Sequence, residues 1–190
     1  MEEQELLNKC FKNNETALTE LYKRFSSKMY GLCLRYAKNK MDAQDLLHDG
    51  FVKVLEGIKT FRSEGSLEGW LKKIMINTAI NFYKKKYAVI FYDIEEADEN
   101  VIFDDDLISK FSANDLLSVI QELPEGYRLV FNLFAIEGYK HNEIAEILNI
   151  SENTSKTQLM KARCILMNKI KKFDFEESKM NSKKKEFTLV

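Results

Sequence analysis

Two short amphipathic patterns separated by a tight turn occupy residues 138–163, and this segment constrains the fold more than any other. Apolar residues of the first pattern recur at three- and four-residue steps, at Ile144, Ala145, Ile147 and Leu148. This spacing predicts a short helix with one apolar face. Asn149 then tolerates left-handed backbone geometry, Ile150 fills the corner, and Ser151 can accept a hydrogen bond from the free N–H groups of the next helix.

The second pattern separates apolar from polar residues along a second helix. Its predicted buried stripe consists of Leu159, Ala162, Ile165 and Leu166. Its predicted outward residues are Glu152, Asn153, Lys156, Thr157, Gln158 and Lys161. Ser155 is a polar exception within the stripe, and this exception is tolerable if Ser155 packs close to Ala145.

Two helices joined by so short a turn form a helix-turn-helix, whose second helix has the width to enter the major groove of DNA. An ordinary pair of helices in a bundle would show the same periodicity. The turn residues and the polar outer face favour DNA binding, because Asn and Gln can pair with adenine while Lys can reach guanine or a phosphate oxygen.

The remainder of the chain is also predicted to be helical. Seven Gly and one Pro in 190 residues leave few interruptions, which favours long helices over many short strands. Cys10, Cys33 and Cys164 are scattered, as is typical of reduced thiols in a cytosolic protein. No apolar run approaches the roughly 18 residues that a bilayer requires, and the N-terminus is acidic where a signal peptide is basic. We therefore expect a soluble, cytoplasmic, all-α protein without membrane insertion.

Charge is distributed unevenly along the chain. The net charge is −1, yet residues 88–112 carry eight Asp or Glu and a single Lys, whereas residues 1–87 carry 16 Lys or Arg and 11 Asp or Glu. The acidic segment lacks clear helical periodicity and predicts a linker between two helical domains, at 1–87 and 113–172, followed by a tail at 173–190. It is either a solvated connector or a segment that mimics nucleic acid in a basic channel of a partner.

Four helices are predicted in the first domain, at 2–12, 15–38, 41–58 and 66–86. The third is expected to bury Leu47, Phe51, Val54, Leu55 and Ile58. Near its start it presents Asp42, Asp45, His48 and Asp49, which the helix dipole favours. Asp45 and His48 have the spacing of one metal-ligand pair, but the second pair that a di-metal bundle needs is missing, so we expect no metal.

Basic, amide and aromatic side chains combine in the connection 59–65 and in the fourth helix. Phe61 looks exposed and could receive an unpaired base. Along the helix the predicted core residues are Leu67, Trp70, Leu71, Ile74 and Thr78. The predicted polar residues are Lys72, Lys73, Asn77, Asn81, Lys84, Lys85 and Lys86. This mixture is typical of proteins that bind single-stranded nucleic acid, although a solvated basic face would have a similar composition.

These segments together resemble the extracytoplasmic-function (ECF) group of bacterial sigma-70 family RNA polymerase sigma factors. The resemblance rests on ALTELYKRF, DAQDLLHDGFVKVLE, TFRSEGSLEGWLKKIMINTAINFYKKK and LPEGYRLVFNLFAIEGYKHNEIAEILNIS, and it covers about residues 15–87 and 113–172. It implies a sigma-2-like helical bundle and a sigma-4-like helix-turn-helix domain joined by the acidic linker. It also implies a factor without catalytic residues or cofactors that binds core RNA polymerase and directs promoter-specific initiation.

The resemblance implies three sets of site residues. The third helix is expected to dock on the clamp helices of the polymerase β′ subunit through Asp42, Gln44, Asp45, Leu46, His48, Asp49, Phe51 and Val52. The loop and fourth helix are expected to open and capture the −10 element through Phe61, Arg62, Ser63, Lys72, Lys73, Asn77, Asn81, Lys84 and Lys85. The second helix of the helix-turn-helix is expected to read the −35 element through Glu152, Asn153, Thr154, Lys156, Thr157, Gln158, Lys161 and Arg163.

Further partners follow from the same resemblance: the β flap of the polymerase, promoter DNA and an anti-sigma factor, with the linker threaded through the RNA exit path. The chain departs from the family pattern where His48 replaces the usual Gln and where Gly50 follows Asp49. The tail has no counterpart in the family core and is expected to be disordered or a minor contact. A stand-alone helix-turn-helix regulator is the alternative function.

Overall fold

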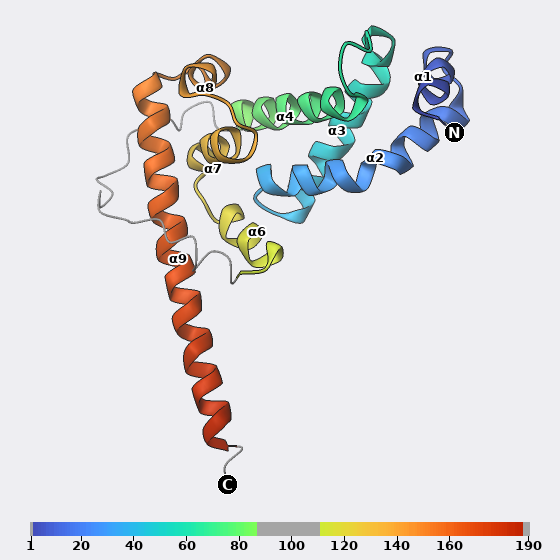
Figure 1. Cartoon of the computed structure of the whole chain (residues 1–190). Helices are drawn as coiled ribbons and strands as arrows, with labels where there is room; N and C mark the ends of the chain where they lie inside the picture. Colours follow the sequence, from blue (N-terminus) through green and yellow to red (C-terminus); the bar gives the residue numbers. More distant parts are fainter. Residues whose placement is uncertain (1, 87–110, 188–190) are drawn as a thin grey trace. The chain divides into compact units, whose positions relative to one another are not determined.

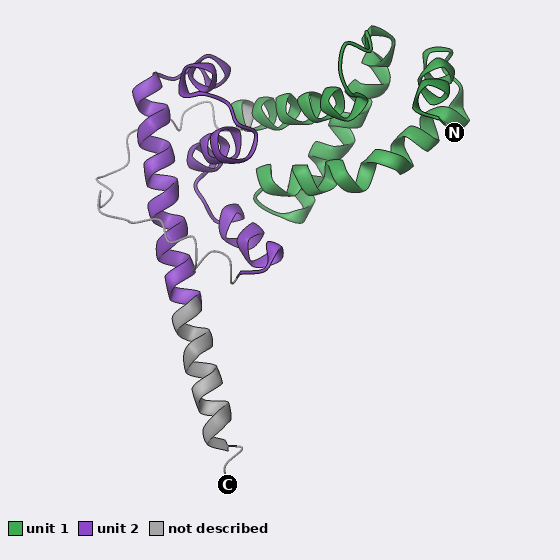
Figure 2. Cartoon of the chain, in the orientation of Figure 1, with its two compact units in different colours: residues 1–89 green, residues 90–190 purple. Residues whose placement is uncertain are grey.

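The computed structural model describes residues 2–86 and 111–187, with side chains at 2–84 and 111–173 (Figure 1). Every regular element in these ranges is helical, which confirms the predicted all-α class. The chain divides into two compact units, residues 1–89 and 90–190 (Figure 2). The predicted acidic linker lies outside the described residues as far as residue 110.

Three long helices form the body of unit 1: α2 (Glu15–Tyr36), α3 (Lys40–Gly57) and α4 (Leu67–Lys86). Each of them packs against the other two. The short helix α1 (Glu3–Phe11) packs against α2 and against η1 (Ile58–Thr60), a 3-10 turn that follows α3.

Polar side chains define where the three long helices begin. Asn14 Oδ1 accepts a hydrogen bond from Ala17 N at 3.0 Å, and Asn39 Oδ1 accepts one from Asp42 N at 2.8 Å. Ser66 Oγ accepts one from Gly69 N at 3.0 Å. These bonds satisfy N–H groups that have no partner within the first turn of a helix, so the sequence itself sets the starts.

The buried face of α3 is rotated from the predicted one. Leu55 is 42% exposed rather than buried, and Leu47 is only half-buried. Phe51, Val54 and Ile58 are buried as predicted, and the buried face also includes Ala43, Leu46 and Gly50. Both α2 and α4 pack on α3, so the face between these two neighbours becomes the core.

Gly50 leaves room on α3 for the side chain of Met75 from α4. A Cβ atom added at Gly50 would lie 2.2 Å from Sδ and 2.9 Å from Cε of Met75 on α4. Met75 is fully buried, so its side chain has little free space into which it could move. The cost of glycine in a helix, about 1 kcal/mol relative to alanine, is therefore offset by the packing of Met75.

Unit 2 contains α6 (Ala113–Gln121), α7 (Glu125–Phe131), the π-helical turn η2 (Asn132–Ile136), α8 (His141–Leu148) and α9 (Glu152–Phe187). α6, α7 and α8 all pack on α9, as Figure 1 shows for the upper part of this long helix. The core between α6 and α9 consists of Val119, Leu123, Ala162 and Leu166. α9 is helical as far as Phe187, past the predicted end of the second domain at residue 172, and neither Gly nor Pro interrupts it.

A buried arginine joins α6 to α7. Arg128 is only 1% exposed, and its Nη1 donates hydrogen bonds of 2.9 Å to the backbone oxygens of both Gln121 and Leu123. One further turn along, Asn132 Nδ2 donates to the Arg128 backbone oxygen at 2.8 Å. Carbonyl groups at the end of α6 therefore have a charged donor in place of water.

Gly50→Ala is expected to destabilise the protein, although alanine is the better helix former. Displacing Met75 should cost about 1–3 kcal/mol. In a Met75→Ala background the space is open, so Gly50→Ala should stabilise by about 1 kcal/mol. Denaturant unfolding of the four proteins of this cycle measures both effects.

Gly31→Ala is the matched control, because an added Cβ on this exposed position of α2 has no neighbour within 4 Å. It should stabilise by about 1 kcal/mol in either background. Equal effects of Gly50→Ala with and without Met75 would contradict the packing role of Gly50.

Candidate nucleic-acid interface

The turn between α8 and α9 has the geometry that the sequence predicts. Asn149 adopts φ 58° and ψ 51°, in the left-handed region. The Ile150 N–H donates to the Ala145 oxygen at 3.0 Å, which closes the end of α8. Ser151 Oγ accepts from Thr154 N at 2.9 Å, which caps the start of α9. The turn is thus fixed by local bonds, and the angle at which α9 leaves α8 is fixed with it.

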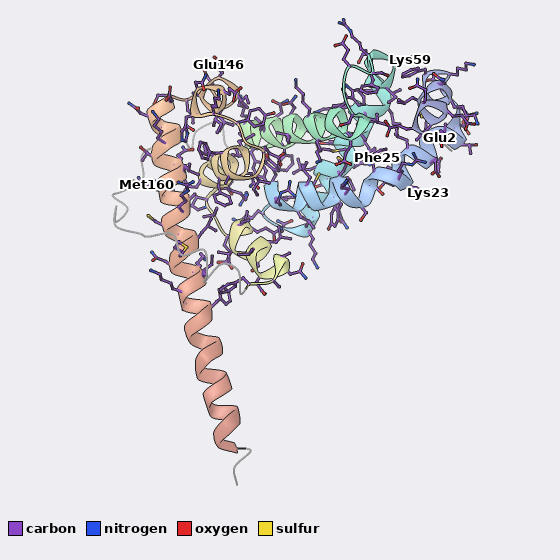
Figure 3. All side chains as sticks on the ribbon, viewed as in Figure 1. Glu2, Lys23, Phe25, Lys59, Glu146 and Met160 are labelled. Atoms are coloured by element: carbon purple, nitrogen blue, oxygen red, sulfur yellow. The ribbon has the colours of Figure 1, made fainter. Side chains whose placement is uncertain are left out.

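The first turns of α9 present polar side chains to solvent. Glu152, Asn153, Lys156 and Arg163 are exposed, while Thr154, Thr157 and Lys161 are half-buried. Glu152 Oε1 and Lys156 Nζ lie 2.7 Å apart, and the bond from Lys156 lowers the pKa of the Glu152 carboxyl. Figure 3 shows the side chains that line α8 and α9, with Glu146 and Met160 labelled.

Gln158 does not face outward, so this part of the prediction was wrong. Its side chain is 92% buried, at 8% exposure, because position 158 lies on the same face of α9 as Ser155 and Ala162. The amide packs on α7, where a Cβ added at Gly126 would lie 3.3 Å from Gln158 Nε2. Among the described residues, no donor reaches the buried Oε1 of Gln158.

Ser155 is fully buried, and its polar group has a side-chain partner that the sequence analysis missed. Its hydroxyl oxygen lies 2.9 Å from Nδ1 of His141, the first residue of α8. The His141 ring is stacked on Phe134 of η2, with ring centroids 4.4 Å apart and planes 21° apart. The two partners are 14 residues apart in the chain, so periodicity within one helix could not reveal the pair.

A pocket of about 380 Å³ lies in the loop between η1 and α4. The Phe61 and Trp70 rings, with centroids 5.4 Å apart, form its apolar part. Phe61 is 9% exposed, so the exposed position expected for its ring was wrong, although the ring does line the pocket. The other lining residues are Thr60, Arg62, Glu64, Gly65, Ser66, Gly69 and Lys73.

An exposed polar stripe continues from this pocket along α4. Lys73, Asn77 and Asn81 are spaced by four residues, and all three are exposed. Arg62 and Ser63 of the loop are also exposed, and Ser63 has a φ of 56°. Lys73 belongs to both the pocket and the stripe, so the two form one continuous surface.

The other predicted lysines of this helix have different surroundings. Lys72 and Lys84 are half-buried, and the side chain of Lys85 lies outside the described residues. Lys72 Nζ is held 3.0 Å from Glu68 Oε1, while Lys28 Nζ of α2 lies 2.6 Å from Glu68 Oε2. These two lysines lower the pKa of the Glu68 carboxyl. Lys72 is therefore paired with Glu68, whereas the ammonium group of Lys73 belongs to a residue that lines the pocket.

The predicted docking residues of α3 divide between its two faces. Gln44, Asp45, His48, Asp49 and Val52 are exposed. The structure contradicts an outward position for the other three, because Asp42 is 7%, Leu46 0% and Phe51 4% exposed.

Two exposed apolar residues that the sequence analysis missed, Met41 and Leu55, extend the outward face of α3. The α3 stripe therefore consists of residues at helical spacing: Met41, Asp45, His48, Val52 and Leu55. Val52 and Leu55 are neighbours at one end of this stripe, and Met41 lies at the other end.

All three cysteines are free and buried. Burial raises the pKa of the Cys33 thiol to about 12 and also raises the pKa of the Cys10 thiol. In the described ranges no cluster of ligand-type side chains could hold a metal ion, and no helix there is long and apolar enough to cross a bilayer.

Comparison with known proteins adds independent information on both units. Residues 21–88 match the family described as Sigma-70 region 2, and residues 113–164 match the family described as Sigma-70, region 4. The chain is 32% identical over 150 residues to RNA polymerase sigma factor SigV of Bacillus subtilis, which covers 76% of this chain and 86% of that protein.

A second relative extends over more of the chain. The ECF RNA polymerase sigma-E factor of Haemophilus influenzae is 26% identical over 180 residues, covering 88% of this chain and 95% of that protein. Among solved structures, the sigma factor RpoE of Bartonella quintana, in complex with the anti-sigma factor NepR, has a similar fold. Its TM-score is 0.50 at 16% identity, with 80% of this chain and 96% of that chain covered.

Gln158→Met is expected to stabilise the protein by about 1 kcal/mol, because a buried acceptor without a donor is replaced by an apolar group of similar shape. Asn153→Met, on the exposed face of the same helix, should change the stability by less than about 0.5 kcal/mol. Denaturant unfolding measures both. A loss of stability in Gln158→Met would show that the Gln158 amide makes a favourable buried bond.

Proposed function

The chain belongs to the sigma-70 family, and we propose from this premise that it is an ECF sigma factor that binds core RNA polymerase and directs promoter-specific transcription initiation. One observation carries the proposal. A region 2 unit with an aromatic-lined pocket and an amide stripe occurs in the same chain as a region 4 unit with a helix-turn-helix. The two units suit the two elements of a promoter, one melted and one duplex.

We assign the reading of the −35 element to α9 within residues 113–172. Its exposed first turns offer Asn153 for adenine, Lys156 for guanine or phosphate, and Glu152 for the amino group of cytosine. The backbone of the second helix in a helix-turn-helix lies in the major groove with its N-terminal residues nearest the bases. Gln158 supports the packing of α7 on α9 and is left out of this set.

We assign the capture of the −10 element to the pocket and the stripe of α4, within residues 1–87. Phe61 and Trp70 supply an aromatic surface on which an unstacked base can lie. Lys73 at the edge of the pocket attracts phosphate, and the amides of Asn77 and Asn81 can bond to bases or sugars along the strand. Aromatic, cationic and amide groups thus follow one another along a single path.

Docking on the polymerase is assigned to the α3 stripe. Exposed apolar side chains at both of its ends, with Asp45 and His48 between them, suit a partner helix pair that carries basic residues. The β′ clamp helices are the proposed partner, and the β flap is the proposed partner of the region 4 unit. The bound state of the Bartonella relative supports a similar anti-sigma partner for this chain.

The proposed activity is non-catalytic, and its place is the cytoplasm, where core polymerase and promoters meet. The factor forms and breaks no covalent bond, because recognition and strand capture need only binding energy. The acidic linker is proposed to follow the RNA exit path, where its eight carboxylates imitate the charge of RNA.

A stand-alone regulator is the second candidate, and two surfaces of unit 1 speak against it. Such a regulator needs neither the α3 stripe nor the pocket beside Trp70. Mapping the 5′ ends of transcripts made by core polymerase with and without this protein tests the choice. A sigma factor creates new start sites, each with a shared −10 and −35 element, whereas a regulator leaves core polymerase without specific starts.

Substitutions in α9 and in α4 are expected to affect different steps of promoter binding. Asn153→Ala should relax the base preference at one −35 position by about 1–3 kcal/mol, and Lys156→Ala should weaken all promoters about equally. Asn77→Ala should leave duplex binding intact and reduce strand opening, measured as permanganate reactivity of unpaired thymines. Loss of −35 preference in Asn77→Ala, or normal opening, would refute the assignment of α4.

Val52→Glu is expected to weaken binding to core polymerase by about tenfold or more, because it places a charge in the apolar part of the stripe. Ser27→Glu is the control, since it adds the same single negative charge on an exposed part of α2. Fluorescence titration of labelled protein with core polymerase measures both affinities. Equal affinity of the two variants would exclude the α3 stripe as the docking surface.

A further inference from the structure

His141 links three elements of unit 2 through one side chain. It is the first residue of α8, its ring is stacked on Phe134 of η2, and its Nδ1 lies 2.9 Å from Ser155 Oγ on α9. The other side of this junction involves Arg163 of α9, whose guanidinium carbon lies 5.9 Å from the centre of the Phe134 ring. The start of α9 is therefore held through His141 and Phe134 as well as through the turn.

The burial of Ser155 favours one tautomer of the neutral His141 ring. Ser155 is fully buried, and within the described part of the chain His141 Nδ1 is the one side-chain partner of its hydroxyl. A buried hydroxyl hydrogen needs an acceptor, and Nδ1 can accept it only when Nδ1 itself carries no proton. In that arrangement the neutral ring carries its hydrogen on Nε2.

Charges around the ring oppose a second proton. Burial and the neighbouring Lys156 lower the pKa of His141 below its usual value of 6.5; Glu152 acts in the opposite direction and Arg163 in the same direction as Lys156. Residues 132–136 of η2 carry no titratable side chain, and Glu143 of α8 accepts the Lys140 N–H at 2.7 Å. Protonation at Nδ1 would also remove the acceptor of the Ser155 hydroxyl.

We propose that His141 is a positioning residue for promoter recognition. Its neutral imidazole, stacked on Phe134, accepts a hydrogen bond from the Ser155 hydroxyl and thereby fixes the first turns of α9. The inference rests on the proposed reading of the −35 element by α9. Ser155 lies between Asn153 and Lys156 in the chain, so the anchor acts on the backbone that carries both reading side chains. A shift of that backbone misplaces them relative to the base edges.

The tautomer can be observed directly. His48→Gln leaves His141 as the single histidine of the chain, which has two. In this full-length variant, ¹⁵N NMR of the imidazole is expected to show an unprotonated Nδ1 and a protonated Nε2 at pH 7.5. Ser155→Ala should shift the ring toward a mixture of both tautomers. A proton on Nδ1 at pH 7.5 in the His48→Gln protein would overturn the proposal without any reference to DNA.

Recognition is tested with the polymerase holoenzyme as the ratio of its affinities for promoters with and without the −35 element. This ratio cancels the sequence-independent attraction to phosphates. His141→Phe keeps the stacking and removes the acceptor, so the ratio should fall by about tenfold, the value of one base contact. His141→Asn supplies an oxygen near the position of Nδ1 and should recover most of the ratio. An unchanged ratio in His141→Phe would overturn the proposal.

The pH profile separates positioning from simple packing. Because the neutral ring is the active form and its pKa is lowered, the ratio should stay constant above about pH 6.5 and fall as the pH drops below that value. In His141→Asn the profile should be flat. If the wild-type holoenzyme itself shows no −35 preference, the proposed function fails; if it shows one that His141→Phe retains, only the positioning role fails.

Discussion

The close contact between Gly50 of α3 and Met75 of α4 sets the separation of the two helices on which the surfaces of unit 1 depend. Each helix turns one face to this contact and the other to solvent. The outward face of α3 carries the α3 stripe, and the outward face of α4 carries Asn77 and Asn81. Since the buried Met75 side chain fills the space beside Gly50, the packing of this contact determines which faces of α3 and α4 remain exposed. The two proposed binding surfaces therefore both depend on the packing of Met75 against Gly50.

In unit 2, polar side chains at the helix ends fix the directions of the helices. Its helices are short apart from α9, and short helices have a large share of unsatisfied backbone groups at their ends. Arg128 donates hydrogen bonds to backbone oxygens where α6 ends. Asn149 provides the left-handed residue that ends α8, and Ser151 accepts a hydrogen bond from an N–H group where α9 begins. A small helical unit that must hold one helix in a defined direction gains more from such fixed termini than from additional apolar area.

The sequence was sufficient to predict whatever is decided within one helix or one turn. The all-α class follows from apolar periodicity and few Gly and Pro, and the turn at Asn149 and Ser151 follows from side chains that bond to their own neighbours. Burial was harder to predict from the sequence, because it depends on which edge of an apolar face the neighbouring helices cover. Gln158, Asp42 and Phe61 were placed outside and are buried, whereas Leu55 was placed inside and is exposed. The His141–Ser155 pair lies beyond any local pattern, since it joins two helices across the turn.

The burial of every native thiol makes this protein suitable for site-specific chemistry. Cys10, Cys33 and Cys164 are shielded, and the raised pKa of Cys10 and Cys33 keeps these two in the unreactive neutral form at ordinary pH. A single cysteine introduced on the surface would therefore react with a maleimide dye or a cross-linker well before the native ones. Distances between the two units, and the path of each across a promoter, thereby become accessible to single-molecule fluorescence on an otherwise unaltered chain.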